Sequence, residues 1–160
     1  MRSDPSQKSY TVKEATIKLM QFCAYRDRSQ KEVETKLREM RMIPQACEQI
    51  TIKLMQENFL NEERFARSFV RGKFRIKKWG RIKIKQELKK RDISAPLIKT
   101  AFTEIDDSEY FTTLEEVAAK KLNLIKEANP YKKKQKLVYY LQQRGFEIPL
   151  ILQATEDFKF

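Results

Sequence analysis

The sequence predicts an all-α protein made of three tandem three-helix modules, which together form an elongated, curved repeat protein. Apolar residues recur at spacings of three and four along the chain, and strand-like alternation is nowhere sustained. Glycine and proline are scarce, with three and five among 160 residues, whereas the helix formers Lys, Glu, Leu and Gln are common. Both observations favour helices throughout.

An internal repeat divides the chain. A shift of 53 residues lays Ile84, Leu88, Arg91, Ile93, Pro96, Ile98 and Ala101 over Leu137, Leu141, Arg144, Phe146, Pro149, Ile151 and Ala154. A looser shift of 51 lays Val33, Leu37, Met42 and Ile50 over Ile84, Leu88, Ile93 and Ala101. We therefore expect a flexible tail at residues 1–9 and modules at 10–60, 61–104 and 105–160. Small modules in series make an extended molecule.

Signals for the starts of about nine helices follow in order along the chain. They are the capping boxes Thr11–Glu14 and Ser29–Glu32, the cap residues Asn61, Asp107 and Asn129, and the prolines Pro44, Pro96, Pro130 and Pro149. After the second helix of each module the chain must turn sharply, and Gly145 suits a left-handed residue there. Arg41 and Asp92 take the same place in the other two repeats, where only Asp is a tolerable substitute.

The positive charge is concentrated in the middle of the chain. Residues 64–103 hold 14 basic and two acidic side chains, which accounts for the whole net charge of +12. A block of this kind indicates contact with a polyanion, because neutralised phosphates release their condensed counterions. The alternative is a solvated basic face that serves solubility.

A stripe of arginines opens this block. Helical spacing places the stripe on one face, and its members are Arg64, Arg67, Arg71 and Arg75. A guanidinium group donates two parallel hydrogen bonds, so the stripe suits either DNA phosphate or an acidic protein surface. A solvated stripe without a partner is the alternative interpretation.

A basic loop and the helix after it extend the stripe into one candidate contact patch for protein or DNA. Its further members are Lys73, Lys77, Lys78, Trp79, Arg81, Lys83, Lys85, Lys89 and Lys90. Trp79 suits stacking on an exposed base, although packing in the core is the commoner role of a tryptophan beside a helix start. A smaller basic cluster, beside three tyrosines and offset by nearby acids, consists of Lys132, Lys133, Lys134 and Lys136.

Missing residue types exclude several kinds of chemistry. The chain has no histidine, so it lacks Ser-His and Cys-His nucleophile pairs and imidazole metal ligands. Its three glycines form neither a Walker phosphate loop nor a dinucleotide-binding turn. The acidic cluster Asp106, Asp107 and Glu109 suits a helix N-terminus better than a metal site. We expect Cys23 and Cys47 to be small buried residues. We expect no enzymatic activity, metal, cofactor, membrane span or secretory signal.

Three runs of the sequence carry a resemblance to a known family. They extend from Asn61 to Lys73, from Gly80 to Ile93 and, in the first module, from Arg28 to Leu37. These runs resemble the RecX family of recombination regulators, whose three-module plan the chain follows from about residue 10 to 158. The resemblance is most specific at Arg64-Phe65-Ala66, Phe69-Val70-Arg71, Gly80 and Glu87-Leu88. The chain departs from the family at Arg41 and Asp92, where glycine is frequent, and at Trp79.

From this resemblance we expect a cytoplasmic bacterial regulator of DNA repair and the SOS response. Such a protein binds the RecA recombinase filament on single-stranded DNA, lies in the filament groove, and inhibits ATP hydrolysis, strand exchange and co-protease function. We expect a monomer with no membrane partner. The alternative is a basic helical protein that binds DNA, including duplex DNA, without a recombinase partner.

Overall fold

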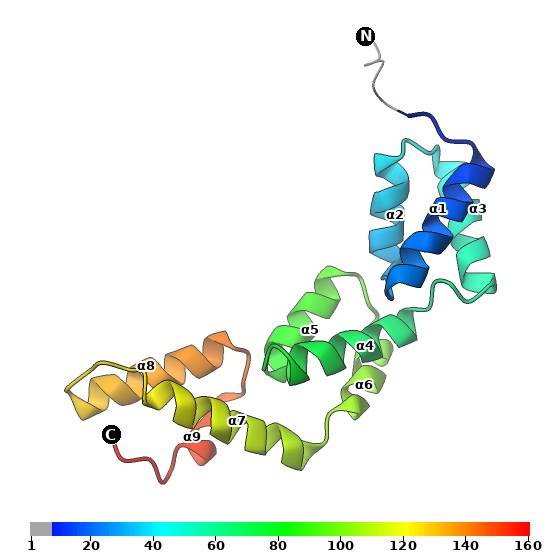
Figure 1. Cartoon of the computed structure of the whole chain (residues 1–160). Helices are drawn as coiled ribbons and strands as arrows, with labels where there is room; N and C mark the ends of the chain where they lie inside the picture. The colour runs from blue at the N-terminus through cyan, green and yellow to red at the C-terminus, as the bar shows by residue number, and fades with distance from the viewer. Residues whose placement is uncertain (1–7) are drawn as a thin grey trace.

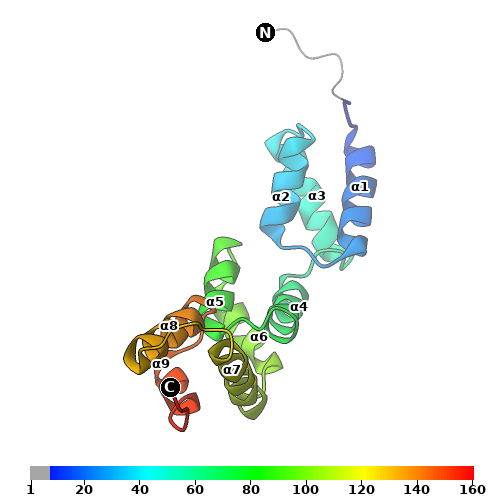
Figure 2. The ribbon, with the colours of Figure 1, turned by 60° about the vertical axis from the view of Figure 1, so that its left-hand side comes forward.

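The computed structural model describes residues 8–160, which form nine α-helices, one 3₁₀ turn and no strand. The all-α prediction is therefore confirmed. Most of the predicted tail, residues 1–7, lies outside the described residues. Figures 1 and 2 show three groups of helices in sequence order along a bent, elongated molecule, as the repeat predicts. No helix in the described part of the chain is long and apolar enough to cross a membrane.

The first group contains α1 (Val12–Tyr25), α2 (Gln30–Glu39) and α3 (Pro44–Gln56). Both predicted capping boxes form. The hydroxyls of Thr11 and Ser29 each accept a hydrogen bond from the backbone N–H three residues later, at 3.1 Å. Pro44 occupies the first turn of α3, where its missing N–H has no helical acceptor to lose.

The second group contains α4 (Glu62–Arg75), α5 (Arg81–Lys90), α6 (Ala95–Ala101) and the 3₁₀ turn η1 (Phe102–Glu104). The third contains α7 (Asp107–Leu122), α8 (Pro130–Gln143) and α9 (Ile148–Ala154). The prediction that Asp107 caps a helix is wrong by one residue. The cap is Asp106, whose carboxylate accepts from the N–H of Glu109 at 3.0 Å, so Asp107 is the first helical residue.

Buried apolar side chains form two clusters among the described residues. One belongs to α1–α3 and extends from Ala15 to Leu60. The other runs without a break through α4–α9. At its centre the ring of Tyr110 lies 5.7 Å from that of Phe74 and 5.4 Å from that of Phe146. The division at residues 104 and 105 stays a prediction, because the second and third groups share one core.

The chain turns as the repeat predicts. Arg41, Asp92 and Gly145 all have left-handed backbones, with φ of 59°, 57° and 94°. Glycine carries no steric penalty in this region, whereas the two other side chains do. Of the two cysteines, Cys23 is buried as expected, whereas Cys47 is only half-buried.

α8 ends directly against the start of α5, so two helices from different groups meet end to end. The N–H of Gly80 donates to the carbonyl of Arg144 at 2.8 Å, and the N–H of Ile82 donates to the carbonyl of Gly145 at 3.0 Å. The first N–H groups of a helix have no acceptor within it, and here the end of α8 supplies acceptors. A Cβ on Gly80 would overlap the backbone of Gly145, so the contact requires glycine.

Candidate polyanion interface

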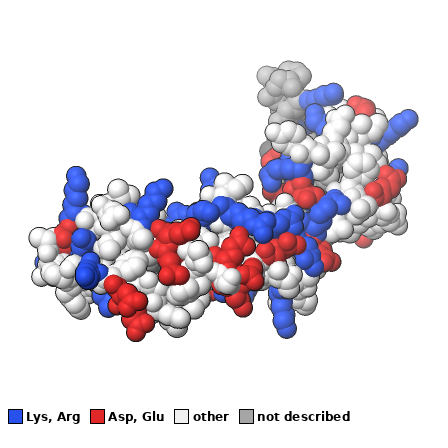
Figure 3. Space-filling view, turned by 60° about the horizontal axis from the view of Figure 1, so that its bottom comes forward, with Lys and Arg blue, Asp and Glu red and all other residues white. Residues whose placement is uncertain are grey.

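The arginine stripe on α4 is paired with carboxylates of the same chain. Arg67 contacts Glu104 at 3.0 Å and Glu63 at 3.1 Å, and Arg71 contacts Glu104 at 3.2 Å. The other arginine pairs are Arg64–Asp27 at 2.6 Å, Arg75–Glu109 at 3.5 Å and Arg81–Asp107 at 2.6 Å. Figure 3 shows the result as a row of basic side chains with acidic side chains directly alongside it.

These pairs change the electrostatics of both partners. The hydrogen bonds that Arg67 donates to Glu104 and to Glu63, in that order of effect, raise the pKa of Arg67 above its usual value. The hydrogen bond from Arg67 in turn holds the pKa of Glu104 below its usual range. The stripe joins α4 to η1 and to the start of α7, so much of its charge is balanced within the molecule.

The unpaired positive charges of this region are lysines. Within residues 8–160 no carboxylate lies within ion-pair distance of Lys73, Lys77, Lys78, Lys83, Lys85 or Lys89, which we call the lysine set. The predicted patch therefore divides into two parts. Its arginines form intramolecular pairs, as does Lys90 with Glu87 at 3.0 Å, and most of its lysines face solvent without one.

Trp79 lies between members of the lysine set at the edge of the core. The indole is half-buried and packs against the core cluster. The ammonium groups of Lys73 and Lys83 lie 4.9 and 4.4 Å from its ring centre. This is the packing role that the sequence favours, and base stacking by Trp79 stays a prediction.

The loop before α5 is held in place by the third group. Arg144 donates hydrogen bonds to the carbonyls of Lys77 and Lys78, the second at 3.2 Å. Lys78 adopts a left-handed backbone with φ of 56°, and the N–H of Trp79 donates to the carbonyl of Lys73 at 3.0 Å. The fixed backbone leaves the side chains of Lys77 and Lys78 exposed.

The second basic cluster lies apart from the lysine set. Lys132, Lys133, Lys134 and Lys136 are at the start of α8, and the end of this helix meets α5. At 1.5 Å per residue, about 10–17 Å of helix separates these lysines from the end of α8 that contacts α5. Lys136 pairs with Glu127 at 2.9 Å, while Tyr131 and Tyr139 are 69% and 64% exposed.

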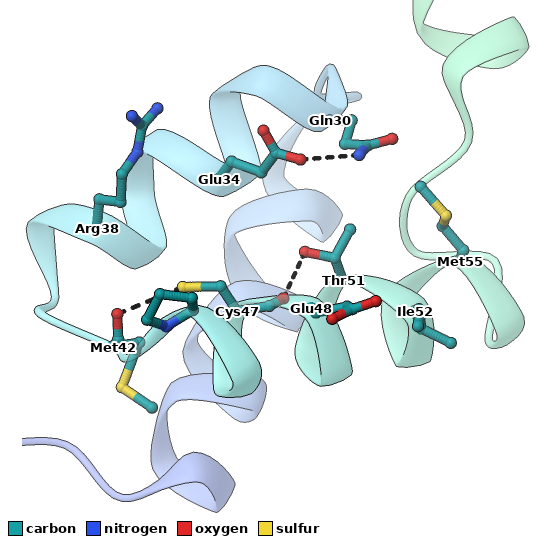
Figure 4. A pocket seen from close by; sticks show the side chains of 10 residues that line it. Gln30, Glu34, Arg38, Met42, Cys47, Glu48, Thr51, Ile52 and Met55 are labelled. Atoms are coloured by element: carbon teal, nitrogen blue, oxygen red, sulfur yellow. Dashed lines mark hydrogen bonds between the residues drawn. The ribbon is translucent and has the colours of Figure 1, made fainter.

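A groove of about 680 Å³ runs between α2 and α3 (Figure 4). Its lining is mixed: Met42, Ile52 and Met55 are apolar, and Glu34 and Glu48 are acidic. The described residues contain no group of three His, Cys, Asp or Glu side chains that could hold a metal ion. The groove therefore offers a contact surface that is partly apolar and partly acidic.

Comparison with known proteins adds family matches to this geometry. Residues 61–101 match the model of the second three-helix domain of RecX, and residues 107–155 match that of the third. Regulatory protein RecX of Vibrio vulnificus is 31% identical over 138 residues, which are 86% of this chain and 88% of that protein. Its counterpart in Clostridium acetobutylicum is 32% identical over 136 residues, or 82% of this chain.

The chain is shorter than several of these relatives. It spans 63% of the Clostridium acetobutylicum protein and 54% of the Lactobacillus johnsonii protein. Among solved structures, the crystal structure of RecX from Lactobacillus salivarius is similar with a TM-score of 0.81 and 23% identity, over 91% of this chain and 95% of that one. At that identity the likeness supports the fold alone.

Proposed function

This chain belongs to the RecX family of regulatory proteins, and on that premise we propose that it binds the RecA–single-stranded DNA filament and inhibits the recombinase. The inhibited activities are ATP hydrolysis, strand exchange and co-protease function. The regulator acts in the cytoplasm, as a monomer, by binding alone. The carboxylates that could suggest a nuclease, Asp107 and Glu109, are each engaged by an arginine.

The lysine set is the observation that carries the proposal for the contact surface. These ammonium groups attract a polyanion without first giving up an internal carboxylate, whereas Arg67 and Arg71 would have to exchange Glu104 for it. A lysine is a hydrated point charge that suits contacts independent of sequence. The long, bent shape in Figure 1 suits a helical groove better than a compact globule does.

Inhibition then follows from differential binding. A regulator shifts an equilibrium between filament states only by the difference between its affinities for them. The proposed regulator binds more tightly to a filament state that is inactive in hydrolysis. Attraction between lysines and DNA phosphates raises the affinity for the assembled filament over that for free recombinase, and added salt weakens it.

The test is single-stranded-DNA-dependent ATP hydrolysis by RecA, titrated with the chain. The variant Lys77→Gln/Lys78→Gln/Lys83→Gln removes three charges of the lysine set. The matched control Lys18→Gln/Lys53→Gln/Lys126→Gln removes three lysines elsewhere. We expect half-inhibition to require at least a tenfold higher concentration of the first variant and no more than a twofold higher concentration of the control. Equal potency of both variants would refute the lysine contact.

A second candidate function, DNA binding without a recombinase, rests on the same unpaired charges. It predicts tight binding to naked DNA and no effect on RecA at any ratio. Fluorescence anisotropy with labelled single strands and duplexes measures this directly. On single strands each phosphate contact contributes about 0.7 to the slope of log affinity against log salt, so loss of three lysine contacts lowers the slope by about 2.

A further inference from the structure

The first three helices form a separate packing unit. Within residues 8–160 their buried cluster, which ends at Leu60, shares no residue with the cluster of α4–α9, which begins at Phe65. Leu60 belongs to the first core, and Asn61 caps α4. The covalent link between the two cores is therefore a single short segment, and Figure 2 shows the first group standing off from the rest beyond it.

The contacts that reach across this junction are polar. Arg64 at the start of α4 donates to Asp27 at 2.6 Å and to the carbonyls of Asn58 and Phe59, each at 3.1 Å. These acceptors all belong to the chain before α4. Arg64 thus holds the first group against α4. Its spacing in the sequence groups it with the other arginines of the stripe, but its contacts are with the first group.

A second clamp joins α2 to the end of α5. The ammonium group of Lys31 donates to the carbonyl of Lys90 at 2.8 Å and lies 3.6 Å from the carboxylate of Asp92. Beside it an open cleft of about 480 Å³ is lined by α2, the end of α1 and the loop between them on one side, and by Lys90 and Arg91 on the other. The two groups face each other here across open space instead of through packed side chains.

The internal repeat explains why this junction is open and the other is closed. The junction of α8 with α5 is made by Gly80 and Gly145 through backbone hydrogen bonds. The same shifts of 51 and 53 place Ser29 and Asp92 at the corresponding positions between α2 and α5. Both residues carry a Cβ, and the N–H of Ser29 donates to the side chain of Glu32 at 2.8 Å instead of to α5.

From this contrast we infer that the protein consists of two rigid units joined by a hinge. The unit α1–α3 rotates about the segment Leu60–Asn61 relative to the unit α4–α9. The clamps formed by Arg64 and Lys31 hold the bent position. The Lys31–Asp92 pair is exposed and the Arg64–Asp27 pair is half-buried, so solvent reaches both, and salt and competing anions weaken them. A polyanionic partner that binds these residues can therefore change the angle between the two units.

Distances between paired spin labels test the hinge without any recombinase. One label is attached to Cys47 and the other to Lys120→Cys on α7, in a Cys23→Ala background. We expect the double variant Arg64→Gln/Lys31→Gln to widen the distance distribution at least twofold. The matched control Arg67→Gln/Lys83→Gln removes two charges within the rigid unit and should leave the width unchanged.

A second label pair, Gln86→Cys with Lys120→Cys in a Cys23→Ala/Cys47→Ala background, reports on the rigid unit alone, and its distance distribution should stay narrow in every variant. Raising the salt concentration should widen the first distribution of the unsubstituted chain and not the second. An unchanged width in Arg64→Gln/Lys31→Gln, or equal widening in the matched control, would overturn the hinge. Broadening of both label pairs would do the same, because it indicates general loosening.

Discussion

The end-to-end contact of α8 and α5 predicts opposite effects for alanine at the three glycines of the chain. Gly145 has φ of 94°, and a Cβ there would lie 2.6 Å from the backbone nitrogen of Lys83. Gly80 has an ordinary φ of −78°, but its Cβ would overlap the backbone of Gly145. Gly72, inside α4, has nothing within 4 Å of the site of a Cβ.

The magnitudes follow from these surroundings. A left-handed backbone costs a non-glycine residue about 1–2 kcal/mol. Moving α8 away from α5 also loses two backbone hydrogen bonds, each of which contributes about 1 kcal/mol. Gly145→Ala should therefore lower the free energy of unfolding by about 3–4 kcal/mol, and Gly80→Ala by about 2 kcal/mol. Gly72→Ala should raise it by about 0.5–1 kcal/mol, because alanine is the better helix former.

Urea unfolding followed by far-ultraviolet circular dichroism measures all three variants on one scale. The three substitutions add the same methyl group, so the variants differ only in the position at which it is added. If Gly80→Ala proved as stable as Gly72→Ala, the helices would not meet as described. The inference that α4–α9 form one rigid unit, on which the hinge depends, would then be refuted.

Local signals made most of the helix boundaries predictable. A capping box is a contact between residues three apart, so Thr11 and Ser29 identify their helices without knowledge of the fold. The repeat likewise located the left-handed residues Arg41 and Asp92, although neither is glycine. At Asp106 and Asp107 the signal is ambiguous, because adjacent aspartates can each cap a helix and only the backbone decides between them.

The pairing of the arginine stripe was not predictable from spacing. Helical periodicity shows that Arg67 and Arg71 share a face, but it does not show what lies opposite. The opposing carboxylate, Glu104, is more than 30 residues later and reaches α4 only through the packing of η1. The acidic cluster that follows the basic block was the one sequence signal for these pairs. Helix capping explains Asp106, but Glu109 pairs with Arg75 instead of capping a helix.

Two further substitutions probe buried polar groups. The hydroxyl of Tyr110 donates to Glu147 at 2.6 Å and accepts from the N–H of Arg81 at 3.0 Å, so Tyr110→Phe leaves two partners unsatisfied and should cost about 1–3 kcal/mol in urea unfolding. No loss of stability would show that water replaces the hydroxyl. Glu62 lies at the hinge with one carboxylate oxygen buried and unpartnered, and burial raises its pKa. A raised pKa in the folded state means that the folded protein binds this proton more tightly than the unfolded chain does. At pH values above the ordinary pKa of 4.5, the ionised carboxylate of Glu62 therefore destabilises the folded protein. Glu62→Gln should therefore raise the melting temperature at neutral pH, and the gain should disappear as the pH falls below that value. A gain that persists in acid would show that the charge of Glu62 is not its cause.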